Sequence, residues 1–179
     1  MKISPFFRTA LIAMAGLAFA GCIAKPAIRV DRDPAVDLRS YRTFGFLETP
    51  ASKAGYTTLV ASRLKDATRT ELERKGYVYS ETQPSLQVNI VLAVVERQKI
   101  QASPAARPFL YRGLSSYDID TVNYRQGTLH VDLVDPVRHA LVWRGVAEGR
   151  VNDKTLENQN ATIGAVIHEL LAGLPGSGT

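Results

Sequence analysis

The chain has 179 residues, of which 45% are hydrophobic and 22% are charged. This length and composition predict one domain, or one domain with a tail, and exclude a chain that is disordered throughout. The single cysteine excludes an intramolecular disulfide and a cysteine-based zinc site. The net charge is +5, and it falls to +3 if the segment that carries Lys2 and Arg8 is removed. That balance is too mild to predict a nucleic-acid partner.

Residues 1–21 have the pattern of a secretory signal peptide. Lys2 and Arg8 precede an apolar stretch, residues 10–20, which is too short to span a bilayer because spanning takes about 20 residues. Gly21 and Cys22 follow, and this end resembles a bacterial lipobox, in which the chain is cut before the cysteine and the sulfur is acylated. The resemblance implies a signal peptide at 1–21 and a lipidated tether at 22–27.

One position of this motif differs, because Phe19 stands where a lipobox favours leucine. Residues 18–20 also match the A-x-A pattern, and cleavage there would release a soluble periplasmic protein that begins at Gly21. We favour lipidation of Cys22, because the soluble alternative leaves an unpaired thiol in an oxidising compartment. Stable anchoring takes two acyl chains. Ile23, in place of an aspartate after the cysteine, implies by the same resemblance the periplasmic face of the outer membrane.

Two short strands are predicted at 28–30 and 41–47, the second with aromatic residues at alternating positions. Between them, Asp31, Asp33 and Asp37 lie close enough in sequence to suggest a calcium loop. Such a loop needs further ligands and a glycine at a fixed place, and a proline, an alanine and a valine fill those positions. We therefore predict turn formation and helix capping by these acids, and no metal site.

An amphipathic helix is predicted at 57–75, with a threonine cap at its start and Gly76 just after its end. A long strand is predicted at 86–95. Its first half alternates between apolar and polar residues, whereas Val91, Ala93 and Val95 make the second half apolar on both faces. This pattern is typical of a central or covered strand, so we predict that the far end of the strand is central in the sheet or covered.

The least regular segment is 102–123, where prolines and a glycine interrupt any pattern. Long irregular segments in compact domains are often functional. Five side chains form the possible binding surface, four from this segment and one from the following hairpin: Arg107, Tyr111, Arg112, Tyr117 and Arg144. Arginine and tyrosine together suit a sugar or an anionic lipid head group. The alternative is that the tyrosines only cover a sheet edge.

A hairpin at 128–144 is the strongest structural signal. Apolar and polar residues alternate along its first strand, and Asp135-Pro136 predicts the turn. The second strand leads to Gly145, where we predict a bulge or the strand end. Trp143 is predicted to lie in the core and Arg144 on the opposite face.

The chain ends with a second amphipathic helix, which we predict from Ile163 to Leu174. Gly173 and Pro175 would end this helix. Residues 176–179 are predicted to form a flexible tail, so the folded domain spans 28–175.

No catalytic site, metal site or cofactor is predicted, and we do not expect an enzyme. His130, His139 and His168 lie in a strand, a turn and a helix, respectively, without an acidic partner at ligand spacing. Asp132 and Asp135 are three positions apart on a strand and are predicted to face opposite sides. We expect Asp135 to cap the turn.

The segment from Tyr124 to Ala147 fits YxxGTLxVDLVDxxxxxLVWRGxA, which resembles the signature of a bacterial lipoprotein family known only as a domain of unknown function. Shorter motifs match the same family: V-D-x-D at 30–33, Y-x-T-F at 41–44, K-G-Y at 75–77 and L-P at 174–175. The resemblance covers 28–175. The middle loop differs, because it is rich in Ser, Ala and Pro where the family is often rich in Gly and aromatic residues. No catalytic residues come with the family.

These patterns predict an α+β, two-layer domain with an antiparallel or mixed sheet of about five strands and two helices packed on one face. We expect a lipid-anchored protein that binds or assembles another envelope component without catalysis. Its partners would be the membrane, through Cys22, and an envelope protein, glycan or lipid. Two alternatives remain: an envelope hydrolase that uses the tyrosine-rich loop with Asp120 or Asp132, and a structural stress-response lipoprotein.

Overall fold

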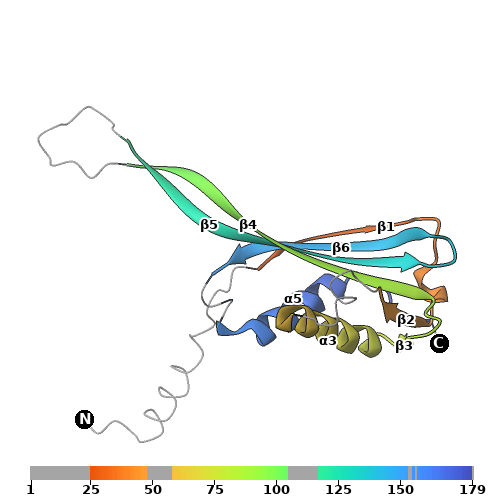
Figure 1. The fold of residues 1–179 in the computed structure, drawn as a ribbon. Coiled ribbons are helices and arrows are strands. Elements are labelled where there is room, and N and C mark those ends of the chain that lie inside the picture. Colours follow the sequence, from red (N-terminus) through yellow and green to blue (C-terminus); the bar gives the residue numbers. More distant parts are fainter. Residues whose placement is uncertain (1–24, 48–57, 105–116, 153–154, 156, 179) are drawn as a thin grey trace, which may run out of the picture.

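The computed structural model of the protein describes residues 25–47, 58–104, 117–152, 155 and 157–178 (Figure 1). The predicted signal peptide, its cleavage site and three predicted binding residues lie outside the described residues: Gly21, Cys22, Arg107, Tyr111 and Arg112. None of the helices within the described ranges is both long and apolar enough to cross a membrane.

Six strands form one mixed sheet. Along the chain the elements are β1 (Ala27–Arg32), the 3-10 helix η2 (Leu38–Ser40), β2 (Thr43–Phe46), α3 (Leu59–Arg74), β3 (Val78–Tyr79), β4 (Leu86–Pro104), β5 (Tyr117–Asp135), β6 (Ala140–Val151) and α5 (Gln159–Leu171). The strand order is β1-β6-β5-β4-β2-β3. β2 runs parallel to β3 and β4, and the other neighbours are antiparallel. The predicted α+β class is confirmed, and the strand that the prediction missed is β3, which has only two residues.

The hydrophobic core lies between the sheet and the helices. β5 contributes the alternate residues Leu129, Val131 and Leu133, as the hairpin pattern predicts, and the neighbouring β6 contributes Trp143. From α5 come Ile167, Leu170 and Leu171, none of which is accessible to solvent. Burial of each such side chain stabilises the fold by about 1.5–3 kcal/mol.

Gly145 lies where Leu170 of α5 packs on the sheet. A Cβ added there would stand 2.6 Å from Cη2 of Trp143 and 3.0 Å from Leu170, so only glycine fits without a shift. The prediction of a bulge or strand end at Gly145 is wrong, because β6 continues through it to Val151. The register shift occurs earlier, where Leu133 pairs with Trp143 and Val134 pairs with Leu141.

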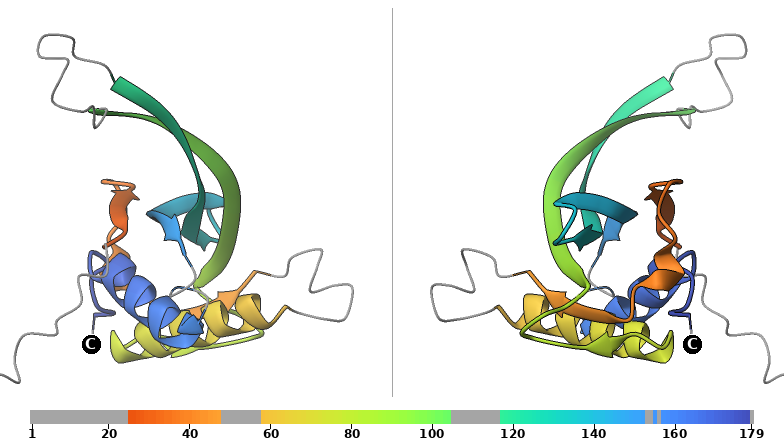
Figure 2. Two further views of the ribbon diagram at one scale, coloured as in Figure 1. Left: turned by 90° about the vertical axis from the view of Figure 1, so that its left-hand side faces the viewer. Right: turned by 90° about the vertical axis from the view of Figure 1, so that its right-hand side faces the viewer.

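The two helices lie side by side on the same side of the sheet (Figure 2). α5 contacts β6 and β1, whereas α3 packs mainly on α5 and contacts the sheet at β3. Thr58 caps α3 by accepting a hydrogen bond from the amide of Ala61, and Gly76 follows its last turn with a φ of 89°, as predicted. The prediction of two helices packed on one face is therefore correct only in part, because α3 reaches the sheet only near its edge.

β4 and β5 are each 19 residues long and continue as a pair beyond β1 and β6 (Figure 1). Their register is continuous from Gln87↔Val134 to Pro104↔Tyr117. We call residues 91–104 of β4 and 117–125 of β5 the arm. The segment predicted to be irregular, 102–123, is strand at both of its described ends, and Pro104 is tolerated because it is the last residue of its strand.

Two family motifs that are far apart in sequence meet at the end of α5. Lys75 Nζ donates to the carbonyl oxygen of Leu174 (2.8 Å), and the Tyr77 hydroxyl donates to that of Pro175 (3.0 Å). Burial, and then the nearby Asp37 carboxylate, raise the pKa of Tyr77 to about 12. Backbone amides at 177 and 178 donate to carbonyls at 75 and 39, so this part of the segment predicted to be a flexible tail is tied to the body.

Candidate binding surface

The arm exposes apolar side chains on both of its faces. Every side chain of β4 from 91 to 101 is exposed. Side chains alternate between the two faces along each strand, and paired residues share a face. The large apolar residues of the arm are therefore Val91, Val95 and Val122 on one face, and Leu92, Val94 and Ile100 on the other. The prediction that the far end of this strand is central or covered is wrong. Beyond Val88, β4 pairs only with β5 among the described strands, and both helices lie against the other end of the sheet (Figure 2).

Charges of both signs accompany these apolar residues. The bases of the arm are Arg97, Lys99 and Arg125, and its acids are Glu96, Asp118 and Asp120. At the base of the arm, the guanidinium of Arg150 stands 4.6 Å from the ring centroid of Tyr124, a cation–π contact. A mixture of apolar and mixed-sign residues suits a protein partner better than an anionic polymer.

Arg144 lies on the face of the sheet away from the helices, as predicted, where it is paired with Asp132. Its Nε and one terminal nitrogen donate to the two carboxylate oxygens of Asp132, at 2.7 and 2.9 Å. The hydrogen bond to Asp132 raises the pKa of Arg144, and the charge of Asp31 on the neighbouring strand adds to this. Two nitrogens of the guanidinium are thus paired within the sheet, while the side chain stays 44% exposed.

Asp135 holds the β5–β6 turn. One of its carboxylate oxygens accepts from the amides of Val137 (2.8 Å) and Arg138 (3.0 Å), and the other accepts from the Tyr41 hydroxyl (2.7 Å). Burial acts to raise the pKa of Asp135, but these hydrogen bonds outweigh it and hold the pKa below its usual range. Turn capping by Asp135 is confirmed, and its partner Tyr41, 94 positions earlier in the chain, was not foreseen.

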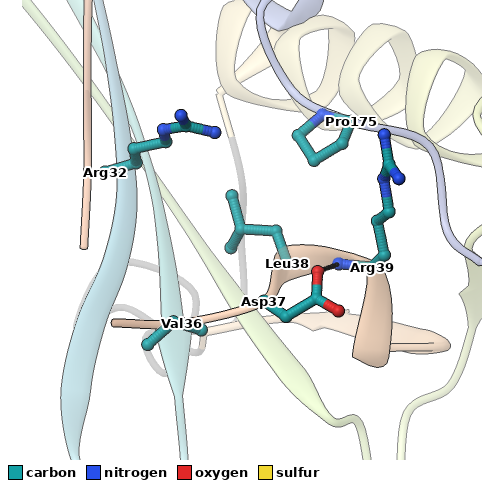
Figure 3. A pocket seen from close by; sticks show the side chains of 6 residues that line it. All are labelled: Arg32, Val36, Asp37, Leu38, Arg39 and Pro175. Atoms are coloured by element: carbon teal, nitrogen blue, oxygen red, sulfur yellow. Dashed lines mark hydrogen bonds between the residues drawn. The ribbon is translucent and has the colours of Figure 1, made fainter. Parts of the chain in front are cut away.

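A shallow pocket of about 260 Å³ lies between η2 and the C-terminal segment (Figure 3). Its walls are Arg32, Val36, Asp37, Leu38, Arg39 and Pro175. Within the described part of the chain, neither arginine of the pocket forms an ion pair. Pockets that hold small-molecule ligands measure about 300–1,000 Å³ and enclose most of the ligand, so this surface hollow is a poor small-molecule site.

His168 has an acidic partner that the sequence did not reveal. Its Nδ1 lies 3.2 Å from Oε2 of Glu71, which also accepts from Arg74, so this cluster joins α5 to α3. The hydrogen bond from Arg74 lowers the pKa of Glu71 against the effect of its burial. The partners are 97 residues apart, so no local spacing pattern could have found the contact. In the described ranges, no group of three or more His, Cys, Asp or Glu residues could hold a metal ion.

The residues predicted to form one binding surface are not brought together. Tyr117 begins β5 at the end of the arm, and Arg144 pairs with Asp132 in the body. Fifteen residues of strand separate Tyr117 from Asp132, or about 50 Å along the sheet. Asp120 and Asp132, of which the hydrolase alternative uses one or the other, are about 40 Å apart by the same measure.

A family model for a domain of unknown function, DUF4136, matches residues 28–176. The chain belongs to this family. The match confirms the family resemblance of the hairpin signature and covers every described strand except the first residue of β1. A search of the curated proteins gave no match to this DUF4136 chain.

Solved structures of low sequence identity resemble the DUF4136 fold. A PDZ domain protein from Parabacteroides distasonis matches 84% of this chain with a TM-score of 0.54 and 10% identity, and the chain spans 36% of that protein. A DUF4136 family protein from Bacteroides thetaiotaomicron gives a TM-score of 0.49 at 12% identity, covering 82% of this chain and 94% of that one. The PelC dodecamer from Paraburkholderia phytofirmans gives 0.48 at 10% identity, covering 84% and 98%.

Proposed function

We propose that this DUF4136 protein is exported, acylated on Cys22 and held at the periplasmic face of the outer membrane, where it binds another envelope component without catalysis. The charged start, short apolar stretch and Gly21-Cys22 ending of the first 22 residues support the anchor. β1 begins at Ala27, five positions after the cysteine, so a fully extended tether reaches only about 17 Å. The body would therefore lie close to the membrane.

The arm is the observation that carries the binding role. Soluble proteins rarely expose clustered apolar side chains unless these form an interaction site. In the described arm, six large apolar residues are at least 44% exposed, from Leu92 at 44% to Ile100 at 72%. Two buried acids of the body, in contrast, are engaged: Asp132 with Arg144, and Asp135 with Tyr41 and the turn amides. These contacts support binding over the hydrolase alternative.

The anchor is tested by fractionating cells that express the wild type or Cys22→Ser. We expect the wild type in the outer membrane, with mass spectrometry showing a mature N-terminus at acylated Cys22. The variant should leave the lipid-anchored fraction. Recovery of wild type from the soluble periplasm, starting at Gly21 with a free thiol, would overturn the proposed anchoring.

The binding role is tested by placing a photoreactive amino acid at Lys99 in the arm and, as a control, at Val137 in the β5–β6 turn. Both sites are exposed, Val137 at 87%. Irradiation of intact cells should give discrete crosslinked bands from position 99 and none from position 137. If position 99 and a second arm position, Val122, give no band, the arm is not the binding surface.

A further inference from the structure

One edge of β4 carries no strand along most of its length within the described part of the chain. β2 pairs with β4 only from Phe44↔Leu86 to Phe46↔Val88, whereas β5 follows the opposite edge from Gln87 to Pro104. From position 89 to the end of β4, no described strand pairs with the backbone groups that face away from β5. A free edge of this length is a template for pairing with another strand.

The hydrogen bonds at the start of β4 fix which residues offer their backbone to this free edge. The carbonyl oxygen of Val88 accepts from the amide of Leu47 on the β2 side (2.9 Å). The two backbone groups of one residue point to the same edge, and successive residues alternate. The β4–β5 register has no shift, so the even-numbered residues face the free edge: Ile90, Leu92, Val94, Glu96, Gln98 and Ile100.

This edge lacks most of the devices by which proteins protect a free strand. Such edges are usually short, bulged, interrupted by proline or lined with lysine. Between 89 and 101 there is no proline and no register shift, and the charged residues are Glu96, Arg97 and Lys99, so positions 89–95 carry none. The uncharged first half of this edge can therefore receive a strand.

We propose that the free edge of β4 pairs antiparallel with the same edge of a second copy of this chain, about a two-fold axis through Val95. This inference rests on the proposed use of the arm for binding, and it names the partner. A two-fold interface places the same surface on both subunits. With the axis at Val95, Val95 faces itself, Ile90 faces Ile100 of the second copy, and Leu92 faces Gln98.

The charges of β4 select this register. An axis at position 96 or 97 would place Glu96 or Arg97 directly opposite its own copy, and an axis at 98 would place Arg97 opposite Lys99. Like charges directly opposite destabilise a strand pair. The axis at Val95 instead puts Arg97 opposite Ala93 and Lys99 opposite Val91. It is the longest pairing available from Ile90 onward that avoids every opposition of like charges.

Cysteine crosslinking of the full-length chain in cell envelopes tests this register. Because even-numbered residues would carry the intersubunit hydrogen bonds, Val95 would form a non-hydrogen-bonded pair with Cα atoms about 4.5 Å apart, within disulfide range. Val95→Cys should give a disulfide-linked dimer when copper–phenanthroline removes two electrons and two protons from the paired thiols. Lys99→Cys, whose two copies would lie about 26 Å apart, should not. The parent chain controls for Cys22.

Lys99→Cys also tests the register when it is combined with a second cysteine variant. Coexpressed with Val91→Cys, it should give a heterodimer that neither variant gives alone, because these positions face each other across the proposed axis. A dimer from Val95→Cys no stronger than that from Lys99→Cys would overturn the register and the proposal.

Charge exchange at the axis tests the pairing without a crosslink. Val95 is 47% exposed, so polar substitutions should leave the body folded, as an unchanged urea midpoint would show. Val95→Lys and Val95→Glu should each weaken dimerisation about fivefold or more, because each places like charges opposite one another. A mixture of the two variants should restore it. Equal dimerisation by all samples would contradict the proposal.

The outcome of the photocrosslinking experiment separates this inference from the proposed function. Bands from position 99 at twice the mass of the chain support self-pairing. Bands that contain a different envelope protein overturn self-pairing but keep the binding role. The absence of any band from the arm overturns both.

Discussion

The same two strands, β4 and β5, behave differently at their two ends. In the body, Leu86 and Val88 on β4 and Leu133 on β5 are each no more than 1% exposed. In the arm, six residues further along β4, Leu92 is 44% exposed and its neighbours are similar. The register between the strands does not change along this length. Burial by the helices, and not strand pairing, is therefore what separates the body from the arm.

This difference shows that a strand rich in apolar residues can extend beyond the helices that cover the rest of the sheet. An isolated two-stranded ribbon is marginally stable in water. The arm is anchored in register by the β5–β6 and β4–β5 pairing of the body, and its residues 97–104 and 117–124 continue without a third strand. Its apolar side chains contribute little to the fold, which leaves them available for a partner.

The largest effect is expected when leucine is replaced by alanine in the body, compared with the same replacement in the arm. Leu86→Ala opens a cavity in the body, and we expect it to lower the free energy of unfolding by about 2–5 kcal/mol. Leu92→Ala, on the same strand in the arm, should lower it by less than about 1 kcal/mol, since much of that side chain is already in water. Urea unfolding of both variants measures the difference. Equal losses would show that the arm belongs to the cooperative core.

A second pair of substitutions concerns tyrosines. Tyr41→Phe removes the hydroxyl that donates to Asp135, and hydrogen bonds to charged groups are worth about 1.5–3 kcal/mol. Tyr124→Phe at the base of the arm keeps an aromatic ring beneath Arg150, and it should change stability by about 0.5 kcal/mol or less.

The loss in Tyr41→Phe should also depend on pH. The pKa of Asp135 is lowered in the folded state, so its contribution is complete above its unfolded pKa of about 3.9. It is lost as the pH falls through the lower, folded pKa. The gap between wild type and Tyr41→Phe should therefore be constant from pH 5 to 7 and shrink below about pH 4. A gap that grows on acidification would contradict the assigned hydrogen bond.

Sequence patterns predicted the parts of the fold whose cause is local. The alternation of Leu129, Val131 and Leu133, the turn at Asp135 and the helix end at Gly76 each depend on neighbouring residues, and all three were confirmed. The uncovered end of β4 was predicted wrongly, because apolar residues on both faces look alike in a covered strand and in an exposed binding strand. Only the positions of α3 and α5 distinguish the two cases.

The candidate site was harder to predict for the same reason. The free edge of β4 depends on where β2 stops pairing, and the ion pair of Arg144 depends on its contact with Asp132 on another strand. Both contacts join segments that are not adjacent in sequence. The predicted binding segment, 102–123, includes the ends of β4 and β5, whereas most of the exposed apolar residues lie on the strands before it.

The smallest effects are expected from replacing two glycines of β6 with alanine. At Gly145 an added Cβ would meet the Trp143 ring at 2.6 Å, so Gly145→Ala should cost about 1–3 kcal/mol through overpacking against α5. Gly149, where the body gives way to the arm, has its nearest neighbour at 3.6 Å, an ordinary contact. Because alanine loses less backbone entropy on folding, Gly149→Ala should be neutral or stabilise by up to about 1 kcal/mol. If thermal unfolding shows that Gly145→Ala destabilises the protein and Gly149→Ala does not, tight packing ends between these two positions. A large loss of stability in Gly149→Ala would instead show that tight packing continues to the base of the arm.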